Sequence, residues 1–255
     1  MIRIERIEKP EELTDEVKKE LTLQYKRTED SVWNKSYIKK ALLEMSHHKC
    51  AYCEMKLGEE GKYMQVEHFH CKKLYPDEVV DWDNLLPSCN RCNSNQGRHD
   101  TVAEPIIDPC IDNPAEYLYI ENYRIKSRHQ NELGKQTIEV LYLNESESLV
   151  LPRFKLGNTL LEKIGDLDEL LKEYIDGTAS STRRKNRVVN GIKELLEQTK
   201  PEKEYSATVA TVIMGDGTYQ SMKNLMKQNS LWNEELEKLD KGAYEISLLK
   251  DKAVL

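Results

Sequence analysis

Two CxxC pairs constrain the fold of this chain more than any other feature of its sequence. The first pair is Cys50 with Cys53, and the second is Cys89 with Cys92. Each pair can turn two thiolates toward one ion, so together they supply a tetrahedral set of ligands. Four soft sulfur ligands suit zinc and leave no position for a reacting water, so we expect a structural zinc ion. The alternative is that two redox motifs, or buried free thiols, coexist here by chance.

The N-terminal residues indicate the cellular compartment of the protein, and this decides how its cysteines are interpreted. The first residues alternate charge with isoleucine, whereas a secretory signal has an uninterrupted apolar stretch after its basic start. We therefore expect a cytoplasmic protein, in which paired cysteines favour metal over disulfides. Cys71 and Cys110 lie outside the two pairs, and we expect them to be small buried apolar residues or spectators without a role.

The composition narrows the class of protein. Hydrophobic residues make up 38% of the chain and charged residues 33%, and no apolar run is long enough for a membrane span. The formal net charge of −7 argues against a protein that coats nucleic acid, because such proteins draw on a basic surface. Any contact with DNA is therefore expected to be local, or assisted by a partner.

Apolar periodicity predicts a mainly helical chain around a short metal module. The segment of the cysteine pairs is broken by Asn, Pro and Gly, as in small metal-nucleated units, and the alternation after Asn113 predicts a strand or a hairpin. Elsewhere apolar residues recur at helical intervals. We expect helices at residues 11–27, 37–45, 135–143, 158–175, 181–198, 218–227 and 229–239.

These patterns predict an α+β fold in which a small zinc-stapled module is embedded in a mainly α-helical chain. The expected regions are N-terminal helices (1–46), the module with the four-cysteine site (47–110), a strand and helix extension of the module (111–155), and a mainly helical C-terminal region (156–255).

Residues suited to phosphodiester hydrolysis lie between and beside the cysteine pairs. Glu67 and His68 come first, Asn84 follows, and Asn93 comes directly after the last cysteine. Hydrolysis needs a base that activates water and a hard cation that neutralises charge on the phosphate. Histidine is a suitable base near neutral pH, and oxygen ligands hold such a cation. Taken singly each residue is more often structural, and a zinc module with a decayed site would have the same pattern.

In this order, Glu-His, Asn and Cys-x-x-Cys-Asn, the chain resembles the HNH endonucleases of the treble-clef, ββα-metal kind. The resemblance implies that His68 is the general base and that Glu67 and Asn93 bind a catalytic magnesium or manganese ion. It also implies that Asn84 orients the histidine or holds its loop. The third motif position is Asn93 instead of histidine, an oxygen ligand that favours magnesium or manganese over softer ions.

The flanking sequence extends the resemblance over about residues 1–155. Its segments are Ile106–Pro109, Asn113–Leu118 and Thr137–Asn144, in a layout similar to the retron-associated and Septu-type HNH nucleases of bacterial antiphage defence. The resemblance implies an ABC/SMC-like ATPase as partner, docked on the helical C-terminal region. The alternative is that these helices only complete a core, as leucines at helical spacing usually do.

Two sets of basic residues could contact phosphates, although exposed basic residues often mean only a solvated surface. The set near the motif is Lys72, Lys73, Arg91, Arg98 and His99. A second set could contact DNA, an acidic face of a partner, or only water; it is Arg183, Arg184, Lys185 and Arg187.

The leading hypothesis is a metal-dependent endonuclease of phage defence, with DNA as the expected substrate and RNA or tRNA left open. One alternative is a catalytically silent zinc module that binds nucleic acid or protein. The other is a stand-alone restriction or mobile-element HNH nuclease, which would cut without an ATPase.

Overall fold

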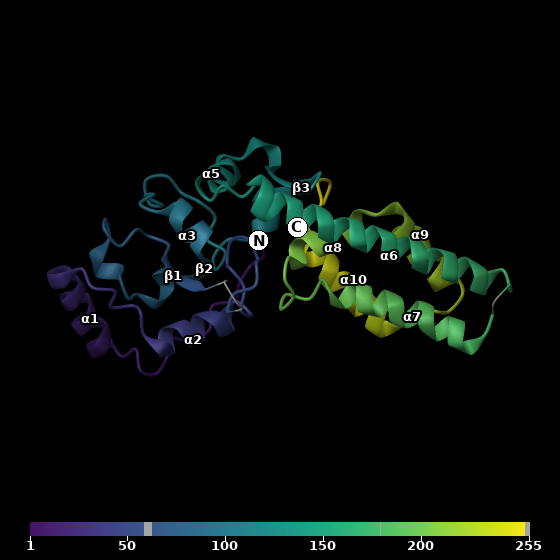
Figure 1. Ribbon diagram of the computed structural model, residues 1–255, viewed down its shortest axis with the longest axis horizontal. Coiled ribbons are helices and arrows are strands. Elements are labelled where there is room, and N and C mark those ends of the chain that lie inside the picture. Colours follow the sequence, from purple (N-terminus) through teal and green to yellow (C-terminus); the bar gives the residue numbers. More distant parts are fainter. Residues whose placement is uncertain (59–62, 179, 253–255) are drawn as a thin grey trace. The chain divides into compact units, whose positions relative to one another are not determined.

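The described part of the chain folds as a helix-dominated α+β protein with two small sheets (Figure 1). The computed structural model describes residues 1–58, 63–178 and 180–252. Internal contacts divide the chain into two compact units. Unit 1 comprises Met1–Leu118 and Lys126–Asn144, and unit 2 comprises Tyr119–Ile125 and Glu145–Leu255. In the described ranges, no helix is both long and apolar enough to cross a membrane.

Unit 1 begins with two helices, α1 at Asp15–Thr28 and α2 at Ser36–Met45. Both helices were predicted from apolar periodicity, and the structure confirms them. Helix α1 starts four residues later than the predicted residue 11, because Thr14 caps it and its side chain accepts a hydrogen bond from the backbone N–H of Val17 at 3.3 Å.

An antiparallel two-stranded sheet and a short helix follow α2. Strand β1 spans Met64–His68, β2 spans Leu85–Cys89, and α3 spans Asn90–Gln96. All five residues of β2 are buried, so this strand forms the interior of the module. The connection between the strands contains two 3-10 turns, η1 at Pro76–Glu78 and η2 at Trp82–Asn84.

Short elements around a hairpin follow α3 in the chain, as the alternating pattern after Asn113 predicted. The helix predicted at 135–143 is confirmed but begins earlier, because the Asn131 side chain accepts a hydrogen bond from the N–H of Gly134 at 3.1 Å and caps it. The boundary between the two units passes through the hairpin. The elements are α4 (Pro114–Tyr117), β3 (Leu118–Glu121), β4 (Arg124–Ser127), η3 (Arg128–Gln130) and α5 (Glu132–Val140).

Unit 2 is mainly helical and has its own apolar core. Buried leucine and isoleucine side chains of the longest helix pack there with those of the following helices, so the periodic leucines do complete a core. The predicted helices at 181–198 and 218–227 are confirmed, and the helix predicted at 158–175 is confirmed but begins already at Leu151. The elements are a π-helical turn η4 (Ser146–Val150), α6 (Leu151–Ile175), α7 (Thr182–Glu197), α8 (Ser206–Gly215), α9 (Gly217–Gln228) and α10 (Glu234–Ile246).

Two helices of unit 2 differ from the sequence-based expectation. Helix α8 was not predicted, because it is buried on most of its surface and therefore lacks the polar face that produces a helical pattern. The prediction of a helix from residue 229 is wrong for its first five residues. Helix α10 begins only at Glu234, where the Asn233 side chain accepts a hydrogen bond from the N–H of Leu236 at 2.9 Å.

Candidate functional site

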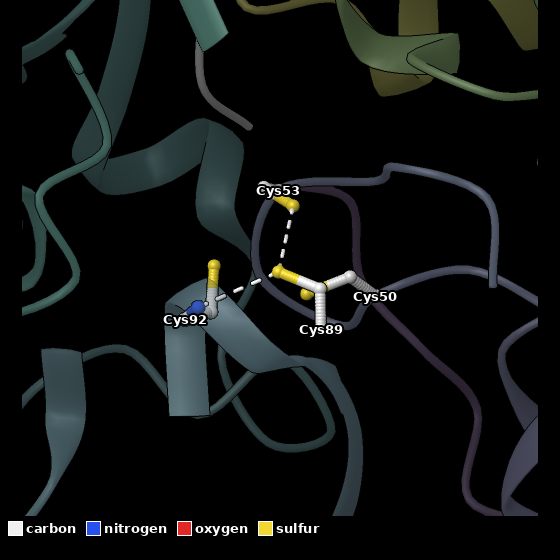
Figure 2. Close-up of side chains that lie close together, drawn as sticks. All are labelled: Cys50, Cys53, Cys89 and Cys92. Atoms are coloured by element: carbon white, nitrogen blue, oxygen red, sulfur yellow. Dashed lines mark hydrogen bonds between the residues drawn. The ribbon is translucent and has the colours of Figure 1, made fainter. Parts of the chain in front are cut away.

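The four cysteines predicted to bind zinc converge in unit 1 (Figure 2). The sulfur atoms of Cys50, Cys53, Cys89 and Cys92 all lie within 4.8 Å of one another, and the residues are at most 2% exposed. The sulfurs of Cys53 and Cys89 are 3.8 Å apart. Four sulfurs placed tetrahedrally at about 2.3 Å from an ion are separated by about 3.8 Å. The donor set and its spacing therefore fit a structural zinc ion.

Local backbone geometry turns both cysteine pairs toward one point. After Cys53 the chain reverses at Glu54, which has a left-handed φ of 63° and donates its backbone N–H to the carbonyl of Cys50 at 3.0 Å. In the second pair, the Cys89 sulfur caps α3 by accepting the backbone N–H of Cys92 at 3.4 Å. The CxxC spacing thus brings each pair together through a turn in one case and a helix start in the other.

Strand β1 and helix α3 bring Glu67 against Asn93. The Asn93 Nδ2 atom donates to Glu67 Oε2 at 2.8 Å, and Glu67 Oε1 accepts the backbone N–H of His68 at 3.0 Å. Burial raises the pKa of Glu67 to about 8, although the hydrogen bond from Asn93 and the charge of Lys72 act in the opposite direction. A bound cation would stabilise the ionised form of such a carboxylate.

His68, the last residue of β1, has one ring nitrogen in a hydrogen bond and one without a partner. Its Nε2 atom lies 2.9 Å from the carbonyl oxygen of Val79, and because a carbonyl only accepts, Nε2 carries the proton. The lone pair is then on Nδ1, which is buried without a hydrogen-bond partner among the described residues. Burial, and next the charge of Lys72, lower the pKa of His68 to about 3, so the ring is neutral near neutral pH.

A cavity of about 300 Å³ lies beside these side chains. Glu67, His68 and Asn93, which come from β1 and α3, line it together. The structure thus brings three of the four residues of the predicted hydrolytic site to one cavity. The other residues that line the cavity are Cys71, Lys72, Lys73, Ser94, Gly97 and Arg98.

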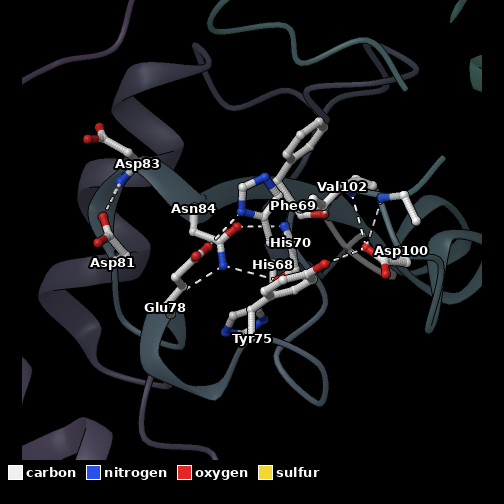
Figure 3. Close-up of polar contacts among 12 residues, drawn as sticks. His68, Phe69, His70, Tyr75, Glu78, Asp81, Asp83, Asn84, Asp100 and Val102 are labelled. Carbon is white, nitrogen blue, oxygen red and sulfur yellow. Dashed lines mark hydrogen bonds and ion pairs between the residues drawn. The ribbon is translucent and has the colours of Figure 1, made fainter. Parts of the chain in front are cut away.

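Asn84, the fourth predicted residue, contacts the loop after His68 instead of the histidine ring (Figure 3). Its Oδ1 atom accepts the backbone N–H of His70 at 2.6 Å. Its Nδ2 atom donates to the carbonyl of His70 at 3.1 Å and to that of Glu78 at 3.2 Å. Asn84 is 5% exposed, so these bonds form in a dry environment and hold the loop in one shape.

Comparison with known proteins identifies the relatives of the chain. No protein-family model matches it. It is 43% identical to the Septu protein PtuB of Bacillus thuringiensis over 239 residues, which cover 94% of this chain and 92% of that protein. The chain belongs to the Septu protein PtuB family. A second relative, the Septu protein PtuB of Bacillus mycoides (strain KBAB4), is 26% identical over 216 residues, or 69% of this chain and 72% of that protein.

In this member of the PtuB family, two of the basic residues considered for phosphate contact are engaged elsewhere. The guanidinium group of Arg91 donates to the carbonyl of Tyr142 at 3.0 Å and to the sulfur of Cys92 at 3.2 Å. The Nε2 atom of His99 lies 2.7 Å from the carbonyl oxygen of Glu104. Neither residue lines the cavity, so Arg91 supports the cysteine cluster and His99 supports its own loop.

The basic run on α7 lies in unit 2. Arg183, Lys185 and Arg187 are exposed, whereas Arg184 pairs with Glu173 of α6 at 2.8 Å. Three of the four cations are therefore presented to solvent by this unit.

Gln96 is a buried residue of the site that the sequence analysis did not single out. Its Nε2 atom donates to the carbonyls of His68 at 3.3 Å and Phe69 at 2.9 Å, and its Oε1 atom accepts the hydroxyl of Tyr52 at 2.8 Å. Gln96 thus ties the end of α3 to the end of β1. Its position four residues after Cys92 places it on the same face of α3 as that ligand, which is the one signal that could have indicated it.

The two remaining cysteines lie apart from the four-cysteine cluster. Cys71 is buried, as expected, and lines the cavity. Cys110 is only half-buried, and desolvation raises the pKa of its thiol to about 12. A thiol with a raised pKa is a poor nucleophile near neutral pH.

Proposed function

We propose that the chain is a metal-dependent HNH endonuclease that hydrolyses phosphodiester bonds in nucleic acid, with DNA as its substrate. Membership of the Septu family makes it a component of an antiphage defence system. Two features support the assignment to the HNH class. The first is the ββα arrangement of β1, β2 and α3 together with the four-cysteine cluster, and the second is the order of the motif residues.

The observation that carries the proposal is the state of His68. A general base needs a free lone pair close to the water that it activates. In His68 the Nε2 proton is bound to a carbonyl, and Nδ1 is the unpartnered atom of a residue that lines the cavity. His68 would therefore accept the proton of a water placed in that cavity.

Glu67 and Asn93 would hold the catalytic ion. Magnesium or manganese prefers oxygen ligands and is often bound by one or two carboxylates together with substrate phosphate. The carboxylate of Glu67 and the amide oxygen of Asn93 offer such ligands on one wall of the cavity. The bound ion would neutralise negative charge on the phosphate as the bond breaks. The zinc of the four cysteines would stabilise the fold and take no part in cleavage.

Plasmid cleavage with added magnesium tests this function. The full chain should nick or linearise supercoiled plasmid, alone or with the proposed ATPase partner, and His68→Ala should lose most of this cutting. His99→Ala is the matched control, because it removes a half-buried imidazole outside the cavity. A chain that binds DNA but never cuts it, with or without the ATPase, would identify a silent zinc module instead.

The resemblance to Septu-type nucleases also supports an ABC/SMC-like ATPase as partner, docked on unit 2. Charge reversal of Arg183, Lys185 and Arg187 together should weaken co-purification with that ATPase if their exposed face binds it. The zinc content of unit 1 should not change. Unaltered co-purification would move the docking surface away from α7, and efficient cutting without any ATPase would favour a stand-alone nuclease.

A further inference from the structure

One aromatic side chain contacts both the proposed base and a cation of the cavity. Trp33 lies edge-on to the ring of His68, with ring centroids 4.6 Å apart and an interplanar angle of 83°. The Nζ atom of Lys72 lies over the same indole, 4.9 Å from its ring centroid. Trp33 therefore fixes His68 and Lys72 relative to each other.

The connection between α1 and α2 holds Trp33 in this place. Its ring packs edge-on against Tyr25 of α1, with centroids 5.8 Å apart, and its neighbour Val32 is 3% exposed. The carbonyl of Trp33 accepts the backbone N–H of Lys35 just before α2 begins. This segment lies outside the motif residues, so the N-terminal helices contribute a wall to the site.

The cations that line the cavity differ in their partners. Lys73 is ion-paired with Glu29, so its charge is partly neutralised. Lys72 lies over the indole of Trp33 and forms no hydrogen bond or close ion pair with a described residue, although its charge acts on Glu67 and His68. A cation over an aromatic face is held in position but keeps its N–H donors for another acceptor. Arg98 is exposed and lies at the rim. Lys72 is thus the half-buried cation with donors available inside the cavity.

We propose that the ammonium group of Lys72 binds a non-bridging oxygen of the substrate phosphate in this cavity, and that Trp33 is the positioning residue that holds Lys72 there. This inference rests on the proposed hydrolysis. Lysine is a compact charge that binds phosphate well without requiring bidentate geometry. A phosphate held by Lys72 lies in the cavity that His68 also lines.

Binding of inorganic phosphate tests the site without any need for cleavage. The full chain is titrated with phosphate at constant ionic strength and without added magnesium, by isothermal calorimetry and by tryptophan emission. Loss of a charge-assisted hydrogen bond weakens binding by about 10-fold to 100-fold, and that is the loss expected for Lys72→Gln. Lys19→Gln makes the same change of net charge on the exposed side of α1 and should bind phosphate as the parent chain does.

Variants of Trp33 separate positioning from a structural role. Trp33→Leu should weaken phosphate binding while zinc content and the unfolding temperature of unit 1 stay near those of the parent. Trp33→Phe keeps an aromatic face for the cation and should restore most of the affinity measured by calorimetry. Trp82 and Trp232 remain in this variant, so an emission change that is lost in it comes from Trp33. If Trp33→Leu bound phosphate with full affinity, Trp33 would have no positioning role.

The outcomes also distinguish this inference from the proposed function. If Lys72→Gln bound phosphate like the parent chain, or if Lys19→Gln lost as much affinity, Lys72 would not be the phosphate ligand. If phosphate binding depended on Lys72 but the chain cut no nucleic acid with magnesium and the proposed ATPase, Lys72 would be the phosphate ligand and the proposed hydrolysis would be refuted. If Lys72→Gln cut nucleic acid at the parent rate, the proposed hydrolysis would be supported and the assignment of Lys72 as the phosphate ligand would be refuted.

Discussion

The Nδ2 atom of Asn93 donates a hydrogen bond to Oε2 of Glu67 over 2.8 Å, which joins the helix that contains Cys92 to the strand that ends at the proposed base. Asn93 comes directly after Cys92, whose sulfur belongs to the four-cysteine cluster. An ion in that cluster therefore fixes the start of α3, and with it the position of Asn93 beside Glu67. A ligand of the proposed zinc, Cys92, is therefore the direct sequence neighbour of Asn93, a ligand of the proposed catalytic ion.

The first prediction concerns the zinc. We expect one zinc ion per chain, and we expect Cys53→Ser to lose it and to unfold the module of residues 47–110. Binding of structural zinc contributes about 10 to 16 kcal/mol to the folding of small zinc-binding peptides. The small apolar core of this module therefore does not compensate for loss of the ion. Elemental analysis and hydrogen exchange of unit 1 measure both effects. Cys110→Ser, which alters a cysteine outside the cluster, should keep the zinc. Folded parent protein without zinc would refute the assignment.

The second prediction separates the base from the ion ligands. His68→Ala should lower the cleavage rate by about 100-fold to 10,000-fold, the usual contribution of a general base. Glu67→Ala and Asn93→Ala should instead weaken the catalytic ion, so a higher magnesium or manganese concentration should partly restore cutting in these two variants. Initial rates of plasmid nicking across a metal titration measure this difference. If extra metal rescued His68→Ala equally well, His68 would be an ion ligand and not the base.

The third prediction concerns the loop that Asn84 holds. Asn84→Asp keeps an acceptor for the backbone N–H of His70 but replaces the donor to the carbonyls of His70 and Glu78. Because these carbonyls would then lack a partner in a buried environment, we expect a loss of about 1 to 3 kcal/mol in the free energy of unfolding. Chemical denaturation measures it. Asp83→Asn, an adjacent change at an exposed residue, is the control and should change stability little.

The parts of the site that could be predicted from the sequence are those that depend on the spacing and order of residues along the chain. The CxxC spacing makes each cysteine pair converge by its own turn or helix start, so Cys50 and Cys89 could be assigned to one cluster before any fold was known. Glu67, His68 and Asn93 could be grouped because their order relative to those cysteines resembles that of the HNH endonucleases. Their actual meeting in one cavity depends on the pairing of β1 with β2, which aligns His68 with Leu85.

The parts that could not be predicted depend on tertiary contacts without a local signal. Trp33 reaches His68 only because the connection between α1 and α2 folds over the end of β1, and no spacing in the sequence encodes that contact. Helix α8 has apolar residues such as Val209 and Ile213 but also buried Thr208 and Thr211, so its burial on most sides erases the periodicity on which helix prediction rests.

The last prediction concerns pH and Asp108. This residue is 5% exposed, and burial raises its pKa, although the backbone N–H of Cys110, at 2.8 Å from Oδ1, acts in the opposite direction. A carboxyl whose pKa is higher in the folded state favours folding when protonated, and this contribution is lost as the pH rises through the folded pKa. Ionised Asp108 therefore destabilises the fold near neutral pH. Asp108→Asn keeps an oxygen for the N–H of Cys110 and removes the charge, so it should raise the unfolding temperature at pH 7.

The difference between Asp108→Asn and the parent chain should shrink as the pH falls and should vanish below about 3.9, the usual pKa of aspartate, where the parent side chain is protonated in both states. Thermal unfolding followed by circular dichroism from pH 3.5 to pH 8 measures it. Asp166→Asn, at an exposed position of α6 in unit 2, controls for the change of net charge. If Asp108→Asn were equally stabilising at both ends of this range, loss of a buried charge would not be its cause. If Asp108→Asn were less stable than the parent at pH 7, the ionised carboxylate would stabilise the fold through its contacts. The prediction that its charge destabilises the folded state would then be wrong.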